Sequence, residues 1–409
     1  GTAVEPGSTF KLATLMACME AGMEPSDSVD TGDGEIYFHG LRMRDSNYKD
    51  GGHGEISLKE VFKVSSNVGS ALAVQETFGE NQQAFLDRLK NVGVAQKTGI
   101  KYVGEVEPNV KTSIEDKGWT GTSLTSMAIG YEVTQTPLQT LALYNAVANN
   151  GRLMRPQLVS ELRVGNEVVQ RFEPEIIDAQ ICKKSTLLAC QQMMKDVCEP
   201  GGGGTAQHLF KDKPYTVAGK TGTAKIASGK GYEAGKYRAS FAGYFPADQP
   251  KYSCIVIVAD TKSGIYYGGA IAAPVFREVA DLIYATDPAF HTLSTGPLAE
   301  TQSLPASKDG DRQSLEILYD ALSIDHTKDL ISEWVNVQTG DDKAALVPID
   351  MPESAVPDVR GMGLRDALYL LENAGLRVDY EGIGTVKSQS IAPGTPLRTD
   401  LTTIQIRLS

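Results

Sequence analysis

The chain has 409 residues, a formal net charge of −12 and 41% hydrophobic residues. That length is sufficient for two or three domains, each able to bury its own core. The acidic balance argues against nucleic acid or an anionic membrane surface as a partner. No apolar run reaches the roughly 18 residues that a membrane span needs, and no signal peptide is visible.

The cysteines and histidines give no metal-binding pattern. The chain has five cysteines but no Cys-x-x-Cys pair, and its histidines form no His-Glu-x-x-His motif. We therefore expect buried free thiols, no metal ion and no cofactor. The cysteines are Cys18, Cys182, Cys190, Cys198 and Cys254.

The first third of the chain predicts helices around a loop-rich excursion. An apolar run follows Pro6-Gly7 and predicts a helix over 8–22, whereas Gly, Asp and Ser dominate 24–56. Ser57 and Glu60 form a capping box that begins the next helical stretch. Further helices are expected at 81–92, at 122–149 with a break at Thr136-Pro137, and at 183–198, and a hairpin is expected at 161–172.

The strongest strand signals lie at 215–226, 237–244 and 252–259. The third of these is a continuous apolar, β-branched run, which is typical of a buried strand. A closing helix is expected over 273–285, beginning at Ala273-Pro274.

The first candidate for chemistry is the pair Ser8 and Lys11. On a helix, these residues share one face about one turn apart. An amine made neutral by burial or by a nearby cation can deprotonate a neighbouring hydroxyl, which becomes a nucleophile. Ser-x-x-Lys also occurs at Ser46–Lys49, in a polar, glycine-bounded stretch that we interpret as an ordinary loop.

Two other motifs are candidates for the same site. Ser65 and Asn67 stand at an interruption between helices, where a hydroxyl could relay a proton and an amide could orient a substrate. Lys220-Thr221-Gly222 is not a phosphate-binding loop, because Pro214 stands where that loop needs glycine. It predicts a strand edge whose cation and hydroxyls bind a substrate carboxylate. A second Lys-Thr-Gly, at 97–99, follows a helix end and predicts a structural connection.

In this order, Ser8-Thr9-Phe10-Lys11, Ser65-Ser66-Asn67 and Lys220-Thr221-Gly222-Thr223 resemble the motifs of the penicillin-recognising serine transpeptidases. The flanking sequence is similar to class B, monofunctional penicillin-binding proteins. These flanks are Pro6-Gly7, Gly93 to Ile100, Thr136 to Gln139, Ala218 to Ala224 and Ala272 to Phe276. The resemblance implies the α/β (α+β) transpeptidase and β-lactamase-like fold over residues 1–285, with an antiparallel sheet flanked by helices and an all-helical subdomain.

The resemblance also implies a D,D-transpeptidase that forms an acyl-enzyme on Ser8. Lys11 would be the base, Ser65 would relay the proton to the leaving nitrogen, and Asn67 would hold Lys11 and the substrate amide. The carboxylate of a stem peptide or a β-lactam would bind Lys220, Thr221 and Thr223, with Gly222 allowing close approach. The N–H groups of Ser8 and Thr223 would form the oxyanion hole.

The C-terminal part predicts a linker and a small domain. Residues 286–355 are rich in Ser, Thr, Asp and Pro and predict a partly ordered linker with helices at 313–322 and 328–335. Residues 356–409 resemble a PASTA domain, an αβββ module. A transpeptidase with such a domain is similar to penicillin-binding proteins of cell division. The PASTA domain could equally be a spacer, a protein contact or a muropeptide binder.

Family members carry sheet strands, a non-catalytic domain and a membrane anchor before the nucleophile. We therefore expect this chain to be a fragment of a protein anchored at the extracytoplasmic face of the cell membrane, and the fragment's own activity stays open. Stem peptides and β-lactams are the expected ligands, with division and glycosyltransferase membrane proteins as partners. Two alternatives stay open: a D,D-carboxypeptidase, and a β-lactam sensor or cell-wall-binding module without turnover.

Overall fold

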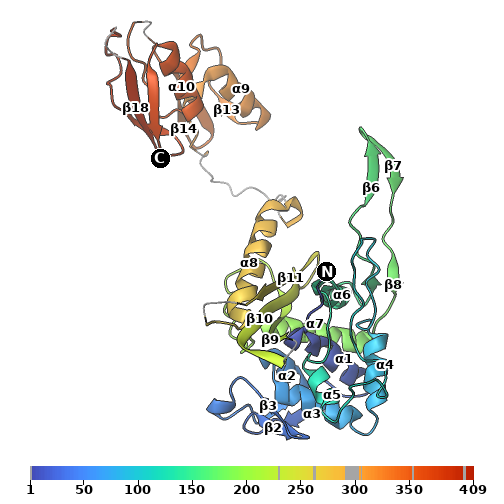
Figure 1. The fold of residues 1–409 in the computed structure, drawn as a ribbon. Coiled ribbons are helices and arrows are strands. Elements are labelled where there is room, and N and C mark those ends of the chain that lie inside the picture. The colour runs from blue at the N-terminus through green and yellow to red at the C-terminus, as the bar shows by residue number, and fades with distance from the viewer. Residues whose placement is uncertain are drawn as a thin grey trace. The chain divides into compact units, whose positions relative to one another are not determined.

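The computed structural model describes residues 2–228, 231–260, 264–290, 304, 306–351, 354–398 and 402–409. The chain divides into two compact units, Gly1–Thr292 and Leu293–Ser409, which have separate hydrophobic cores (Figure 1). No helix found in these ranges is long and apolar enough to cross a membrane.

The first unit is built around helix α1 (Lys11–Glu20), whose side chains from Lys11 to Met19 are all buried. A helix that is apolar on every side must be surrounded, and α1 packs against α2, α3, α4 and α7. The other helices are α2 (Leu58–Val64), α3 (Asn67–Phe78), α4 (Gln82–Asn91), α5 (Ser123–Ala128), α6 (Pro137–Ala148), α7 (Lys184–Cys198) and α8 (Gly268–Thr286). The 3-10 helices are η1 (Gly7–Phe10), η2 (Tyr48–Asp50) and η3 (Pro288–Phe290).

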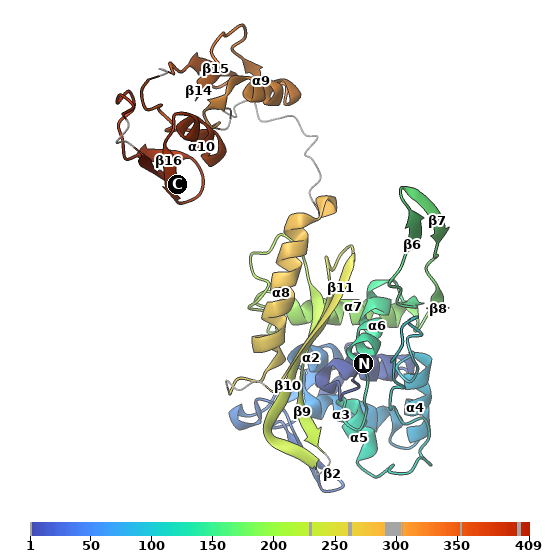
Figure 2. The ribbon, with the colours of Figure 1, turned by 45° about the horizontal axis from the view of Figure 1, so that its top comes forward.

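The main sheet of this unit is antiparallel, with the order β11-β10-β9. Its strands are β9 (Ala218–Ser228), β10 (Gly231–Phe245) and β11 (Tyr252–Ala259). Phe241 and Phe245 of β10 point to α8, where their rings lie 4.8 and 5.9 Å from that of Phe276. The alternate residue Tyr244 is buried on the opposite face, near Cys190 and Cys198 of α7. The sheet therefore lies between α8 and the helical part of the unit (Figure 2).

Short hairpins and pairs complete the first unit. The excursion before α2 contains β1 (Ser28–Asp30) paired with β4 (Glu55–Ser57), and β2 (Glu35–Phe38) paired with β3 (Leu41–Arg44). After α6 come β5 (Leu153–Met154) with β8 (Ile176–Asp178), and the projecting hairpin of β6 (Glu161–Val164) and β7 (Glu167–Arg171) (Figure 1). The predicted excursion, capping box and hairpin are confirmed. All five cysteines are free, and only Cys254 is not fully buried.

Two expectations for this unit are wrong. Strand β11 is only half-buried from Tyr252 to Val258, because it is an edge strand that pairs only with β10 among the described strands. Helix α8 begins at Gly268 rather than at Ala273, and Pro274 lies inside it. A Cβ at Gly268 would lie within 2.4 Å of the Gly222 carbonyl oxygen, so this close start depends on glycine.

In place of the expected linker, residues 310–348 form a folded module in the second unit. It contains β12 (Gly310–Asp311), α9 (Arg312–Ala321), β13 (Asp325–His326), β14 (Trp334–Thr339) and β15 (Lys343–Pro348). The expected helix at 313–322 is confirmed as α9, but the one at 328–335 is wrong, since β14 begins there. Val335, Leu346 and Tyr319 form a small core of this module, and the alternation of buried and exposed residues in β14 and β15 suits a one-sided sheet.

The predicted PASTA segment folds as an αβββ module. It contains α10 (Leu364–Asn373), β16 (Arg377–Glu381), β17 (Val386–Gln389) and β18 (Thr403–Leu408). β16 is parallel to β18 and β17 is antiparallel to it, as β13 and β14 are to β15. The two modules pack together, since Trp334 stacks on Tyr369 with ring centroids 6.0 Å apart.

The two modules also end their helices in the same way. The N–H of Ile324 donates to the Tyr319 carbonyl after a left-handed Ser323, and the N–H of Leu376 donates to the Leu371 carbonyl after a left-handed Gly375. Residues 310–348 and 356–409 are thus repeats of one topology, which the sequence analysis missed. Only Gly375 marks the left-handed cap in the sequence, because Ser323 occupies the equivalent position after α9.

Candidate active site

Ser8 lies in η1, the turn that leads into α1. Gly7 has a left-handed φ of +56°, and its N–H donates to the Gly130 carbonyl at 3.2 Å. A Cβ at Gly7 would lie 3.0 Å from the Ala224 Cβ and 3.1 Å from the Thr223 carbonyl oxygen. Glycine at this position therefore allows the turn that carries Ser8 to approach β9 closely.

Lys11 is fully buried one turn after Ser8. Its Nζ donates to the Ser65 carbonyl at 2.7 Å, to Asn67 Oδ1 at 2.8 Å and to Ser65 Oγ at 3.4 Å. Burial lowers the pKa of Lys11 to about 7, while the Asp45 carboxylate acts in the opposite direction. A neutral amine is consequently accessible near neutral pH.

Ser65 and Asn67 come together because the chain breaks between two helices. α2 ends at Val64, and Ser65 adopts a left-handed φ of 62°. Ser66 then begins α3 as its N-cap, accepting the Gly69 N–H at 2.8 Å. This break directs the Asn67 side chain and the Ser65 oxygens to the Lys11 ammonium.

Lys220 is the second fully buried cation, on β9. Its Nζ donates to the Thr221 carbonyl at 3.0 Å and lies 5.6 Å from the centre of the Phe62 ring. Burial, and then the positive charge of Lys11, hold the pKa of Lys220 well below its usual value. The charge of Lys11 therefore disfavours the charged form of Lys220.

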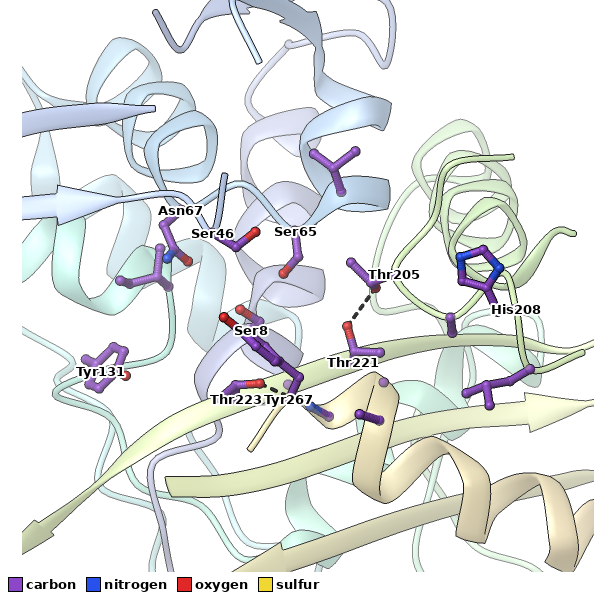
Figure 3. A pocket seen from close by; sticks show the side chains of 18 residues that line it. Ser8, Ser46, Ser65, Asn67, Tyr131, Thr205, His208, Thr221, Thr223 and Tyr267 are labelled. Atoms are coloured by element: carbon purple, nitrogen blue, oxygen red, sulfur yellow. Dashed lines mark hydrogen bonds between the residues drawn. The ribbon is translucent and has the colours of Figure 1, made fainter. Parts of the chain in front are cut away.

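The hydroxyls of Thr221 and Thr223, both on β9, form hydrogen bonds to the glycine-rich loop and to the start of α8. Thr221 Oγ1 lies 2.7 Å from Thr205 Oγ1, at the end of the glycine-rich loop. Thr223 Oγ1 accepts the Gly268 N–H at 3.2 Å, at the start of α8. These contacts fix the hydroxyls on the side of β9 that faces Ser8 (Figure 3).

A pocket of about 480 Å³ opens where η1, the α2–α3 break, β9 and the start of α8 meet (Figure 3). Six of the predicted site residues line it: Ser8, Ser65, Asn67, Thr221, Gly222 and Thr223. Lys11 and Lys220 do not line the pocket but lie buried behind it. In the described part of the chain, no cluster of His, Cys, Asp or Glu side chains could hold a metal ion.

Sequence reasoning missed several lining residues, among them Ser46, Tyr131, Thr205, His208 and Tyr267. Ser46 is the serine of the second Ser-x-x-Lys, interpreted above as part of an ordinary loop, and it lies between Asn67 and Ser65 in Figure 3. The loop interpretation holds for the backbone, but the serine itself faces the pocket. Motif spacing gave no signal for the other residues.

The second Lys-Thr-Gly is a structural connection, as predicted. The Glu105 carboxylate accepts the N–H groups of Thr98 and Gly99 at 2.7 and 3.0 Å and the Thr98 hydroxyl at 2.7 Å. None of these residues lines the pocket that contains Ser8. Gln139 of α6 also donates to Glu105, at 3.4 Å, so this segment is tied to the helix behind it.

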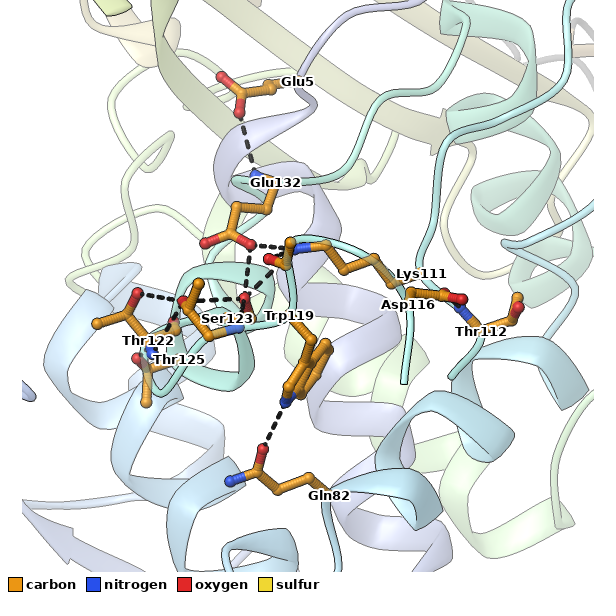
Figure 4. Close-up of polar contacts among 12 residues, drawn as sticks. Glu5, Gln82, Lys111, Thr112, Asp116, Trp119, Thr122, Ser123, Thr125 and Glu132 are labelled. Carbon is orange, nitrogen blue, oxygen red and sulfur yellow. Dashed lines mark hydrogen bonds and ion pairs between the residues drawn. The ribbon is translucent and has the colours of Figure 1, made fainter. Parts of the chain in front are cut away.

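An ion pair beside the pocket supports the segment that carries Tyr131. Lys111 and Glu132 form this pair, and Ser123 Oγ donates to Glu132 at 2.8 Å (Figure 4). The Glu132 N–H donates to Glu5 Oε1 at 3.1 Å, three residues before Ser8. The network thereby joins Lys111, in the loop before α5, to the segment after α5 that carries Glu132 and to the segment before η1 that carries Glu5.

Comparison with known protein families identifies two domains in this chain. Residues 2–281 match the penicillin binding protein transpeptidase domain, and residues 354–409 match the PASTA domain. The chain therefore belongs to the transpeptidase family of penicillin-binding proteins. The predicted class B family and its C-terminal PASTA domain are confirmed.

The curated relatives of this chain include class B penicillin-binding proteins. Peptidoglycan D,D-transpeptidase FtsI of Escherichia coli is 30% identical over 277 residues, and stage V sporulation protein D of Bacillus subtilis is 34% identical over 281 residues. Each match covers 67% of this chain, but 42% and 41% of the relative. The chain thus spans about two fifths of the length of these relatives.

Solved structures confirm the predicted fold class. The transpeptidase domain of Burkholderia pseudomallei penicillin-binding protein 3 is 26% identical with a TM-score of 0.58, covering 70% of this chain and 80% of that one. Penicillin-binding protein 3 of Mycobacterium tuberculosis, complexed with ampicillin, is 27% identical with a TM-score of 0.60 and coverages of 73% and 65%. Penicillin-binding protein 2X of Streptococcus thermophilus is similar in fold over 100% of this chain and 61% of its own, at 18% identity and a TM-score of 0.58.

Proposed function

We propose that the chain carries the catalytic domain of a peptidoglycan D,D-transpeptidase that cross-links stem peptides through an acyl-enzyme on Ser8. The observation that carries this proposal is the buried Lys11, three residues after Ser8, whose ammonium is shared between Ser65 and Asn67. A lysine that is neutral near pH 7 can take the Ser8 proton without histidine.

In the first step, Ser8 Oγ attacks the carbonyl carbon of the penultimate D-Ala, and Lys11 takes the hydroxyl proton. The peptide bond breaks, Ser65 relays a proton to the leaving nitrogen, and the last D-Ala departs. The N–H groups of Ser8 and Thr223 hold the oxyanion, a contribution typically worth about 10²–10³ in rate per donor. The close approach of Gly7 to the Thr223 carbonyl supports this placement.

In the second step, an amine of a neighbouring stem peptide attacks the ester carbonyl, the ester C–O bond breaks, and the amine proton passes to Ser8 Oγ, which restores the free serine. In the first step, before the last D-Ala departs, its carboxylate binds to the Thr221 and Thr223 hydroxyls over the buried Lys220. Asn67 holds Lys11 and the substrate amide. β-Lactams, which carry a carboxylate and an acyl group, occupy the same positions and acylate Ser8.

Slow release of β-lactams is part of the proposal. A β-lactamase needs a general base that activates water against the acyl-enzyme, and no Asp or Glu is among the described residues that line the pocket. The penicilloyl ester is therefore long-lived, and β-lactams inhibit the protein.

We place the reaction at the extracytoplasmic face of the membrane, where the peptidoglycan lies. The family resemblance supports a role in septal wall synthesis, with membrane-bound division proteins and a glycosyltransferase as partners. The full protein would supply the membrane anchor.

The proposal is tested by incubating the protein with a D-Ala-D-Ala stem peptide as donor and a second stem peptide as amine acceptor. We expect a cross-linked dimer and one released D-Ala per cross-link, with neither in Ser8→Ala. Hydrolysed donor without dimer would instead indicate a D,D-carboxypeptidase. Neither product, in a protein that still forms a stable penicillin adduct, would indicate a sensor.

A further inference from the structure

Asp45 is a buried carboxylate outside every motif discussed above. It follows β3 directly and its residue is 3% exposed. Oδ1 accepts the N–H groups of Asn67 and Val68 at 2.5 and 3.0 Å, and Oδ2 accepts the Ser66 hydroxyl at 2.6 Å. Three hydrogen bonds from consecutive residues thus converge on this one side chain.

These donors belong to the N-terminus of α3. The first N–H groups of a helix have no partner within it, and the helix dipole favours a negative charge there. A carboxylate that binds two of these N–H groups and the N-cap hydroxyl fixes where the helix begins. Since α3 begins at Asn67, the same contacts fix the backbone of a residue that holds Lys11.

The carbonyl of Arg44, the residue before Asp45, orients the Asn67 side chain. Asn67 Nδ2 donates to the Arg44 carbonyl at 2.8 Å, so its Oδ1 is directed to the Lys11 ammonium at 2.8 Å. Residues 44 and 45 therefore hold both the backbone and the amide of Asn67. Ser46, the next residue of this segment, lines the pocket.

Resting on the proposed function, we propose that Asp45 is a positioning residue for acylation. It anchors the start of α3 so that Ser65 and Asn67 hold the Lys11 amine beside Ser8. Asp45 does not line the pocket and acts through the residues that do.

Asp45 also has an electrostatic effect on the base. The Asp45 carboxylate, from the segment after β3, is the charged group that shifts the pKa of Lys11 in the described structure, and the amine of Lys220, on β9, is a buried neighbour whose own pKa is lowered by Lys11. Cys198 of α7 lies behind Lys220. The carboxylate raises the pKa of Lys11 against the lowering caused by burial. Removing its charge lowers the pKa further, so Lys11 becomes neutral at a lower pH.

The test is Asp45→Asn, which keeps the shape but removes the charge and an acceptor for the Ser66 hydroxyl. We expect the second-order rate constant for acylation by a fluorescent penicillin to fall by roughly 10- to 100-fold, as for small misplacements of catalytic groups. The acid limb of the pH profile should also move to lower pH. Asp50→Asn, an exposed position in the same excursion, removes the same charge without touching α3 and is the matched control.

A purely structural aspartate would lower the fraction of active protein without moving the acid limb. An unmoved limb, or wild-type acylation by Asp45→Asn, therefore overturns the inference. A second measurement does not depend on enzymatic activity: amide hydrogen exchange at Asn67 and Val68 should be faster in Asp45→Ala than in the wild type, and equal rates overturn the inference. If even the wild-type protein forms no adduct, the proposed function fails, while the exchange data still decide whether Asp45 anchors α3.

Discussion

At the scale of single residues, the proposed chemistry depends on two buried lysines. Lys11 and Lys220 have no exposed surface, and the charge of Lys11 makes the charged form of Lys220 less favourable. The sequence predicted both residues and a lowered pKa for Lys11 from burial. It did not predict that the Lys11 ammonium binds the Ser65 carbonyl more closely than the hydroxyl.

The pH dependence of acylation follows from the Lys11 amine. Its pKa is lowered from 10.5 to about 7, so the neutral base is the minor form below pH 7 and the major form above it. The rate of acylation by penicillin should therefore rise as pH increases through about 7. A stopped-flow or gel-based profile measures this dependence, and a rate that stays flat through that range contradicts the role of Lys11.

Lys11→Arg is the companion variant. Arginine stays protonated at all accessible pH values and cannot serve as the base. The acylation rate should fall by about 10²–10⁴, the usual contribution of a general base.

Asp45 and Ser46 show where residue-level prediction ends. Both lie in a segment whose composition indicates only loops, and the Ser-x-x-Lys motif at Ser46–Lys49 was interpreted as part of an ordinary loop. Their place in the site depends on how the excursion folds against α3, through the hydrogen bonds of Asp45 to Ser66, Asn67 and Val68. Local sequence patterns carry no information on such a long-range contact.

At the scale of elements, the site depends on how closely β9 approaches η1 and β10. A Cβ at Gly222 would lie 2.2 Å from Ser240 Oγ and 3.0 Å from Thr9 Cγ2. The glycine therefore sets the distance between the strand that carries Thr221 and Thr223 and the turn that carries Ser8.

Gly222→Ala should push β9 away from η1 and lower the acylation rate by at least tenfold. Gly222→Ala/Ser240→Ala removes the shortest of these contacts and should recover part of the loss, leaving the contact with Thr9. Rates measured with the same fluorescent penicillin give the double-mutant cycle. Additive effects of the two substitutions would show that the Ser240 contact does not set the position of β9.

Helices and strands were predicted well where hydrophobic periodicity and caps agree, as at α2 with Ser57 and Glu60. Burial was predicted less well. The apolar run of β11 was expected to be buried, but its exposure depends on its place at the edge of the order β11-β10-β9. Strand order is a property of the whole sheet, so a single strand's composition could not reveal it.

At the scale of the whole molecule, the Ser8 pocket and the repeated αβββ modules lie in different units of the chain. Every residue that lines the Ser8 pocket belongs to the first unit, and the second unit has its own cores. The α9 module buries few residues of its own, so it needs few apolar side chains. For this reason the Ser, Thr, Asp and Pro content of 286–355 looked like that of a linker. The module that contains α9 has the same topology as the module that contains α10, so composition alone underestimated the amount of folded structure in residues 310–348.

The most direct test of the account is the intact mass of the full chain after incubation with benzylpenicillin. We expect one stable penicilloyl adduct per molecule, mapped by peptide digestion to Ser8 and absent from Ser8→Ala. Ser46→Ala, which removes the serine of the second Ser-x-x-Lys from the same pocket, should still carry the adduct. An adduct that persists in Ser8→Ala, or that is lost only in Ser46→Ala, would contradict the assignment of Ser8 as the nucleophile.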